Sequence, residues 1–278
     1  MTSAGHDDYL VTIARHGTRV TARSDVFLNY PIYRQPDAPL GMDYFVWVLE
    51  SAERTIVVDT GYSRHGAQVR KRDVLVEVPE LLRRLGVDPA RVETVIITHA
   101  HYDHIGNLDA FPAARFVLSR KEYEFWTGPN ANQPLFHHSV EDDELTTLAG
   151  LVEAGRVDFF DGSTRPAPGV EVIEVGGHTP GQSVVKVQTT QGTVLLASDA
   201  VHYYEELTND MPFSSVADLV EMYDTFARIR AMLDSGEVKH VVAGHDPDTI
   251  GRFTPAAGAL AGVAATIGTP VTTREARS

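Results

Sequence analysis

Three histidines and one aspartate stand within six residues of each other, in the order His-Ala-His-Tyr-Asp-His. An apolar run rich in β-branched residues precedes them, which is typical of a buried strand. If the backbone stays extended after this strand, His99 and His101 project to the same side and can share one metal ion. Asp103 would follow on that side, whereas His104, next to it, can point the same way only if the chain turns, for which Ile105 and Gly106 offer a place. This strand end could therefore supply ligands to two neighbouring ions.

Two simpler interpretations of the cluster stay open at this point: a histidine-rich surface loop, and a site for a single ion. Ligands elsewhere in the chain must decide between them. Three further strand-like runs end on residues of the same kind, namely His178, Asp199 and His245. Singly, each has an ordinary explanation, as a turn residue, a helix cap and a core histidine. Together they favour a metal site.

Asp59 ends another apolar run, 55–58, which the sequence predicts to form a hairpin with 44–49. An aspartate at the end of a buried strand is well placed to orient a metal-bound histidine by a hydrogen bond. The alternative is that Asp59 initiates a turn, which needs no metal.

Composition narrows the class of protein. The 278 residues include 24 Lys and Arg against 38 Asp and Glu, a formal charge of −14, and no cysteine. Disulfides, Cys-ligated zinc and thiol catalysis are therefore excluded, and a nucleic-acid partner is not expected. The first residues lack a secretory signal, and no apolar run reaches membrane-spanning length. We expect a cytoplasmic protein with no membrane partner.

Strands that alternate with helices indicate an α/β fold. The runs that read as strands after the cluster are 114–119, 170–175, 193–199 and 240–246, and those that read as helices are 79–86, 120–126 and 216–233. Ser215 is the expected cap of the last helix. The aromatic segment 25–33 reads either as a loop lining a pocket or, equally, as aromatic side chains packed under a sheet edge. His137 and His138 read as surface residues at a pocket rim.

The order of these ligand types along the chain resembles that of the metallo-β-lactamase-fold hydrolase superfamily. The matching residues are His99, His101, Asp103, His104, His178, Asp199 and His245. The resemblance implies a four-layer αββα sandwich. It also implies a single domain, 1–278, built from two α/β halves of about 1–125 and 165–255, joined by an irregular segment of about 126–164.

Within the superfamily the chain is most similar to the N-acyl homoserine lactonase group, which carries out quorum quenching. The similarity lies in the segments 195–204, 211–213 and 244–246. Lactonases of this group usually place a tyrosine three residues after the bridging aspartate. Here that position is His202, and Tyr203 follows it.

The resemblance implies a centre of two divalent transition-metal ions, for which zinc is the first choice. His99, His101 and His178 would hold one ion, and Asp103, His104 and His245 the other, with Asp199 bridging them. A hydroxide between the ions would attack the carbonyl of a small lactone or ester. Asp103 would carry a proton to the leaving alkoxide, and His202 or Tyr203 would stabilise the oxyanion formed from the carbonyl.

Other functions compete with the lactonase interpretation. A thioesterase of the glyoxalase II type shares the ligand set, but its usual C-terminal basic region is not evident. A phosphodiesterase or nuclease fits poorly with the acidic balance. A non-catalytic binding protein that retains the fold would have no chemical reason to keep all seven ligands. The expected partner is a small-molecule lactone or ester, and exposed aromatic residues in 25–33 would fit a homodimer.

Overall fold

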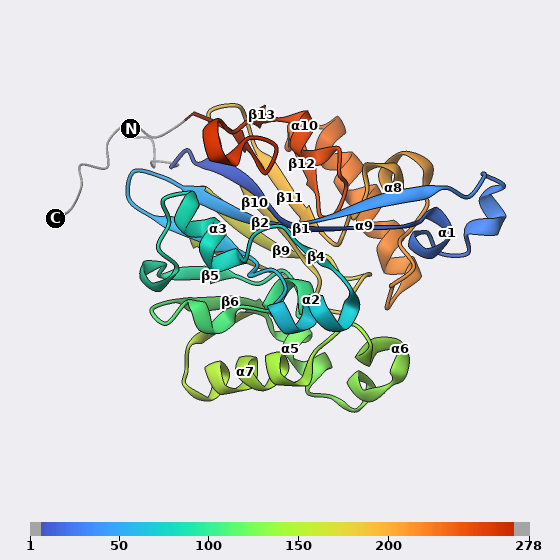
Figure 1. The fold of residues 1–278 in the computed structure, drawn as a ribbon, viewed down its shortest axis with the longest axis horizontal. Helices are drawn as coiled ribbons and strands as arrows, with labels where there is room; N and C mark the ends of the chain where they lie inside the picture. Colours follow the sequence, from blue (N-terminus) through green and yellow to red (C-terminus); the bar gives the residue numbers. More distant parts are fainter. Residues whose placement is uncertain (1–6, 270–278) are drawn as a thin grey trace.

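Two β-sheets packed face to face form the centre of the molecule, in a computed structural model that describes residues 7–269 (Figure 1). The first sheet has the strand order β13-β14-β1-β2-β3-β5-β6-β7, with β4 paired to β1. Its strands are β1 Leu10–Ala22, β2 Pro39–Glu50, β3 Thr55–Val58, β4 Asp73–Val74, β5 Thr94–Ile96, β6 Arg115–Ser119, β7 Val157–Phe160, β13 Thr254–Pro255 and β14 Ala264–Ile267. The second sheet, in the order β12-β11-β10-β9-β8, consists of β8 Ser163–Ala167, β9 Val170–Glu174, β10 Ser183–Val187, β11 Val194–Ser198 and β12 His240–Ala243.

The space between the sheets is filled by apolar side chains from both. Ile13 and Trp47 of the first sheet are fully buried against Val185 and Leu196 of the second. These residues alternate along their strands with others that face outwards, as a sheet covered on both faces requires. The main core of the protein is therefore the inter-sheet layer.

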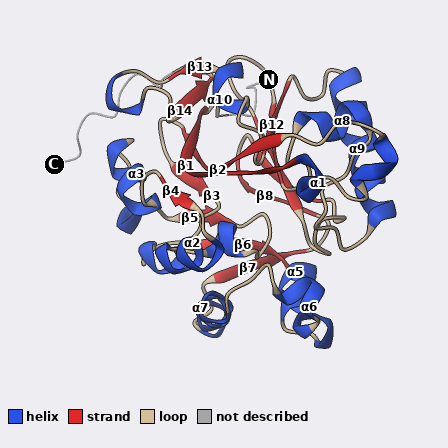
Figure 2. Cartoon of the chain, turned by 45° about the vertical axis from the view of Figure 1, so that its right-hand side comes forward, coloured by secondary structure: helices blue, strands red, loops and turns tan. Residues whose placement is uncertain are grey.

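Helices cover the outer face of each sheet (Figure 2). Leu81 and Leu148, from α3 and α7, pack with Val57 on the first sheet, and Phe226 of α9 packs with Leu195 on the second. The helices are α1 Arg23–Val26, α2 Arg64–Arg70, α3 Val78–Arg84, α4 Tyr102–Ile105, α5 Arg120–Trp126, α6 Pro134–His137, α7 Asp142–Glu153, α8 Tyr204–Asn209, α9 Leu219–Asp234 and α10 Thr249–Arg252. This is the expected four-layer αββα sandwich.

The longest helix, α9, begins later than the sequence suggested. Its N-cap is Asp218, whose carboxylate accepts a hydrogen bond from the Glu221 N–H at 2.9 Å. The prediction that Ser215 caps this helix was wrong. The N–H of Asp218 donates to the carbonyl of Gly177, so a tertiary contact keeps the preceding residues out of the helix.

The segment 126–164 is more regular than expected. It contains α6, the 12-residue α7 and β7, so the prediction of an irregular connection was wrong. Leu148 and Leu151 give α7 an apolar face that covers the sheet, and β7 extends that sheet in parallel with β6. The division into two halves, about 1–125 and 165–255, stays a prediction.

The aromatic segment 25–33 is packed inwards. Phe27 and Tyr30 are only 1% and 4% exposed, in a small core that they share with Tyr203. The homodimer expected from exposed aromatic residues therefore loses that basis and stays a prediction. Within residues 7–269, no helix is both long enough and apolar enough to cross a membrane.

The carboxyl ends of the central strands converge where the two sheets meet. Strands β3 and β5 run parallel in one sheet, and β11 and β12 run parallel in the other. Asp59 and Ser198, at two of these strand ends, have left-handed backbone conformations with φ of 59° and 46°. The Thr98 hydroxyl lies 2.7 Å from Asp59 Oδ2 and 2.8 Å from Ser198 Oγ, so it links the two sheets.

Candidate metal centre

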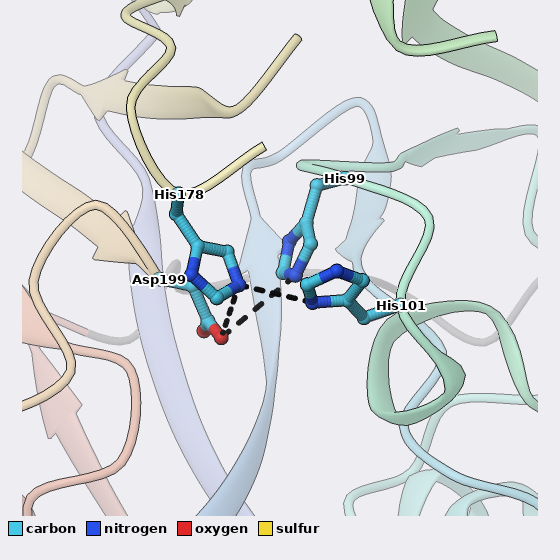
Figure 3. A group of neighbouring side chains, drawn as sticks. All are labelled: His99, His101, His178 and Asp199. Carbon is cyan, nitrogen blue, oxygen red and sulfur yellow. Dashed lines mark hydrogen bonds and ion pairs between the residues drawn. The ribbon is translucent and has the colours of Figure 1, made fainter. Parts of the chain in front are cut away.

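Seven buried side chains converge in two groups at this edge, and they are the seven expected from the sequence. The first group is His99, His101, His178 and Asp199, and the second is Asp103, His104 and His245. In each group, one ligand atom from every residue lies within 4.8 Å of the others. Figure 3 shows the imidazoles of the first group pointing towards one another and towards the Asp199 carboxylate.

The loop after β5 supplies four of these side chains. His99 and His101 precede α4, and His101 is the extended N-cap of this helix, with ψ of 158°. Asp103 and His104 occupy the first turn of α4, which carries them into the second group. The chain therefore turns earlier than we expected. Gly106 is needed for another reason, since a Cβ there would lie 2.2 Å from the backbone nitrogen of Ser63.

Asp199 lies between the two groups. Its Oδ1 is 3.1 Å from Nε2 of His245 and 3.3 Å from Nε2 of His104. Its Oδ2 is 3.4 Å from Nε2 of His178 and 3.8 Å from Nε2 of His99. One oxygen thus faces each group, which is the arrangement a bridging carboxylate needs.

Hydrogen bonds on the outer ring nitrogens fix three of the imidazoles. Nδ1 of His178 lies 2.7 Å from the carbonyl oxygen of Ser215, and Nδ1 of His245 lies 2.8 Å from that of Asp43. Nδ1 of His104 lies 2.7 Å from Oδ2 of Asp59, so the orienting role expected for this aspartate is confirmed. Because each Nδ1 donates outwards, Nε2 of the neutral imidazole presents its lone pair to the interior.

The electrostatic field differs between the two groups. Burial, reinforced by His104 and His101, lowers the pKa of His99, and burial lowers the pKa of His178 to about 3. These imidazoles are therefore neutral, as metal ligands must be. Although burial opposes it, Asp199 and Asp59 raise the pKa of His104, so the second group favours positive charge. Burial also opposes ionisation of Asp199, but His245 and His202 hold its pKa well below the usual value.

The donor set fits metal ions. Nε2 of His99, Nε2 of His104 and Oδ1 of Asp199 are buried, and none makes a hydrogen bond to any residue that the structure describes. Buried polar atoms without partners are costly, and cations would satisfy all three. Nitrogen and carboxylate donors without sulfur suit zinc and similar divalent transition metals.

The two remaining candidates from the sequence lie in different places. His202 is fully buried beside the first group, with Nε2 3.1 Å from Oδ2 of Asp199 and its ring stacked on Phe213 at 3.8 Å. Tyr203 is turned away, because its hydroxyl donates to the carbonyl of Gly41 at 2.9 Å. The structure thus brings His202 to the cluster and places Tyr203 in the neighbouring core.

Sequence reasoning missed a partner of His202. Glu206 is fully buried, with Oε1 3.2 Å from Nδ1 of His202 and Oε2 accepting the His202 N–H at 3.2 Å. Although burial opposes it, Asp199 and Glu206 raise the pKa of His202 to about 9. The available signal was an acidic residue in the first turn of α8, which begins two residues after His202.

A cavity of about 140 Å³ opens beside the first group. The residues that line it include His101 and His178 of the first group and the apolar Phe125, Trp126 and Phe136. His138 also lines it, as the sequence suggested for a pocket rim. A small ligand with an apolar part can therefore approach the cluster from this side.

Comparisons with known proteins agree with this architecture. A family model described as the metallo-beta-lactamase superfamily matches residues 41–245. An N-acyl homoserine lactonase from a Bacillus species is 27% identical over 194 residues, which cover 64% of this chain and 72% of that protein. A solved quorum-quenching N-acyl homoserine lactone lactonase has a TM-score of 0.72 at 23% identity, over 87% of this chain and 93% of its own.

A second solved structure, a dizinc quorum-quenching lactonase in complex with a product, has a TM-score of 0.67 at 17% identity. It covers 96% of this chain and 99% of its own. At these identities the solved structures establish the fold, and the family model establishes descent, because it spans most of the 278 residues. The chain belongs to the metallo-beta-lactamase superfamily.

Proposed function

We propose that this protein is a metal-dependent lactonase that hydrolyses a small lactone or ester. The observation that carries the proposal is the pair of ligand groups that share Asp199, beside a cavity with apolar walls. The names of the relatives, N-acyl homoserine lactonases, support the same substrate class. No comparable observation favours the thioesterase or the non-catalytic binding protein.

We assign two zinc ions to the centre, one held by His99, His101 and His178 and the other by Asp103, His104 and His245. Two such ions supply Lewis-acid polarisation of a carbonyl and acidify a water molecule near neutral pH. The neutral imidazoles and the nitrogen and oxygen donors support zinc, as does the dizinc relative.

The acidic residues of the centre have separate roles in this proposal. Asp199 stays ionised and holds the two groups in register through its two oxygens. Oδ2 of Asp103 is 3.7 Å from Nε2 of His245 and 3.9 Å from Nε2 of His104. Asp103 therefore lies where it can carry a proton to the leaving alkoxide.

We assign oxyanion stabilisation to His202 rather than to Tyr203. Nε2 of His202 points at the cluster, and Glu206 and Phe213 hold the ring in that direction. A donor fixed in advance is worth more than one that must be reoriented during the reaction. The Tyr203 hydroxyl would first have to give up its bond to Gly41.

The cavity next to the first group is the proposed substrate site. Its apolar walls would bury the acyl or ring carbons, while the reacting carbonyl lies over His101 and His178. Burial there also excludes bulk water from the reacting carbonyl, which strengthens every electrostatic interaction with it.

Two measurements test the proposal. Elemental analysis of the purified protein is expected to find close to two transition-metal ions per chain. A pH-stat screen of lactones, thioesters, phosphodiesters and β-lactams is expected to show turnover of lactones above the others. A folded protein that is isolated without metal and binds none would contradict the metal centre, and turnover of thioesters alone would contradict the lactonase assignment.

Asp199→Ala is expected to abolish lactone hydrolysis while the protein remains folded. The substitution removes the carboxylate that both groups share. Folding should survive because Asp199 contacts the ligand histidines and lies at the edge of the apolar core. Circular dichroism and metal content measured together would show this. Retained activity with two bound ions would argue against a bridging role.

A further inference from the structure

A buried glutamate that belongs to neither ligand group lies behind the first of them. Glu122 is fully buried, and its carboxylate accepts four hydrogen bonds. Oε1 accepts from the N–H of Ala100 at 2.9 Å and from Nε1 of Trp126 at 2.8 Å. Oε2 accepts from the hydroxyl of Thr179 at 2.7 Å and from the N–H of Gly181 at 2.9 Å. Every donor lies on or beside a segment of the metal centre.

The positions of these donors connect the two loops that carry the nitrogen ligands. Ala100 stands between His99 and His101, and Thr179 directly follows His178. One carboxylate therefore ties the loop after β5 to the loop before β10. The three imidazoles of the first group can keep their mutual geometry only while these loops stay in register.

The local sequence would direct this side chain elsewhere. Ser119 is the N-cap of α5 and Glu122 stands three residues later, which is the spacing of a capping box. In that motif the glutamate turns back to the N–H of the cap residue, at the surface. Here burial raises the pKa of Glu122, a cost that its hydrogen bonds oppose. A carboxylate needed only by the helix would not have to be buried.

Two neighbours fit the same arrangement. Gly181 has no Cβ, and one placed there would lie 2.3 Å from the backbone nitrogen of Glu122, so the loop can approach only with glycine. Trp126, held by Glu122, packs its ring against His101 with centroids 5.6 Å apart and lines the cavity. The carboxylate thus supports one ligand ring through Trp126.

We propose that Glu122 is a positioning residue that sets the metal affinity of the first ligand group. It touches neither the ions nor the substrate, and acts by holding the backbone on both sides of that group. The inference rests on the proposed metal centre, but it is independent of which ester is the substrate. Groups of this kind, one step removed from the ligands, typically change metal affinity by about 10–100-fold.

The test is titration of metal-free protein with Co²⁺ alone, in competition with a chromophoric chelator and with the d–d absorption recorded. Glu122→Gln preserves size but presents an amide NH₂ to donors that need an acceptor. We expect one of the two Co²⁺ affinities to fall about 10–100-fold, with an altered d–d spectrum and the other affinity retained.

Matched variants separate positioning from general stability. Ser119→Ala removes the N-cap of the same helix and a hydrogen bond to Glu174 at the end of β9, but none of the four donors to Glu122. It should therefore lower Tm and leave both Co²⁺ affinities unchanged. Thr179→Val removes one donor to Glu122, whereas Thr179→Ser keeps the hydroxyl. We expect weaker Co²⁺ binding in Thr179→Val and wild-type binding in Thr179→Ser. This pair tests the role of Glu122 even if Glu122→Gln does not fold.

Distinct results would overturn the two proposals. If the wild type binds two ions and both Glu122→Gln and Thr179→Val bind them with unchanged affinities, the role of Glu122 is refuted and the metal centre stands. Equal weakening in Ser119→Ala and Glu122→Gln would also refute it, because helix stability would then explain the effect. A wild type that binds fewer than two ions would contradict the metal centre and this inference with it.

Discussion

Three of the imidazoles that point into the metal centre are anchored by groups outside it. Asp59, Ser215 and the carbonyl of Asp43 hold three of the rings by Nδ1. His202 lies beside a buried carboxylate, with its Nδ1 3.2 Å from Oε1 of Glu206. The chemistry of the site thus depends on residues that bind neither metal nor substrate.

His202→Phe is expected to lower kcat for a lactone roughly 100-fold, the usual cost of removing one oxyanion donor. Phenylalanine preserves the stacking on Phe213 but leaves the buried Glu206 carboxylate without its imidazole partner, so some loss of stability should accompany the loss of activity. The matched control is Tyr203→Phe, which loses only the hydrogen bond to Gly41 and should keep most of the activity. A larger loss in the control than in His202→Phe would reassign the role to Tyr203.

Glu144 is expected to make stability depend on pH. It is 8% exposed, and burial raises its pKa from 4.5 to about 7, although Ser63 and Arg70 oppose the shift and Asp103 and Asp143 favour it. The folded protein therefore retains this proton at a pH where the unfolded chain has lost it. Stability contributed by the proton is present below pH 4.5 and is lost as the pH rises through about 7.

The measurement compares Glu144→Gln, which cannot ionise, with the wild type by urea unfolding. Between pH 5 and pH 8, the free energy of unfolding of the wild type should fall by roughly 3 kcal/mol relative to that of the variant. A difference that does not change with pH would show that Glu144 titrates normally.

The sequence predicted a helix or strand correctly where the pattern that marks it lies within a single segment of the chain. Strand ends that deliver His or Asp are visible as apolar runs followed by a ligand, which is why Asp199 and His245 could be identified. The start of α9 was not, because the contact between Asp218 and Gly177 joins residues far apart in the sequence. For the same reason Glu122 could be read only as part of a helix, since its partners lie on other loops. Strand β14 was missed as well, since its pairing with β1 joins the two ends of the chain.

Asp218→Ala is expected to destabilise the protein by about 1 kcal/mol, the usual cost of removing an N-cap. The carboxylate of Asp218 is the acceptor for the Glu221 N–H, and alanine leaves that donor without a partner in the helix. Ser215→Ala is the control and should be close to neutral, because its carbonyl, which holds His178, is retained. Thermal unfolding of both variants tests this. A larger drop in Tm for Ser215→Ala than for Asp218→Ala would contradict the assignment of the N-cap.

At the scale of the molecule, the metal centre joins the two halves of the fold. The first half supplies the loop after β5, and the second supplies His178, Asp199 and His245. Because the core between the sheets is also continuous, we propose that residues 7–269 form a single domain, with halves at about 7–125 and 165–255. We propose that the halves unfold together.

Calorimetry with and without a chelator tests this. Metal removal should lower Tm and abolish activity, and each ion should add about 2.7 kcal/mol when its free concentration is ~100 Kd. Both forms should unfold in one transition, and zinc should restore the activity. Two separate transitions in the metal-loaded protein would argue for independent halves.

The left-handed backbones of Asp59 and Ser198 set a limit on engineering this protein. Left-handed φ values favour glycine, so a search for stabilising substitutions would select glycine at both positions. Each side chain, however, bonds the Thr98 hydroxyl, and Asp59 also holds His104. Glycine at either position would relax the backbone, but it would remove these buried hydrogen bonds and loosen the centre. The two residues therefore cannot be exchanged for glycine without loss of both stability and the geometry of the centre.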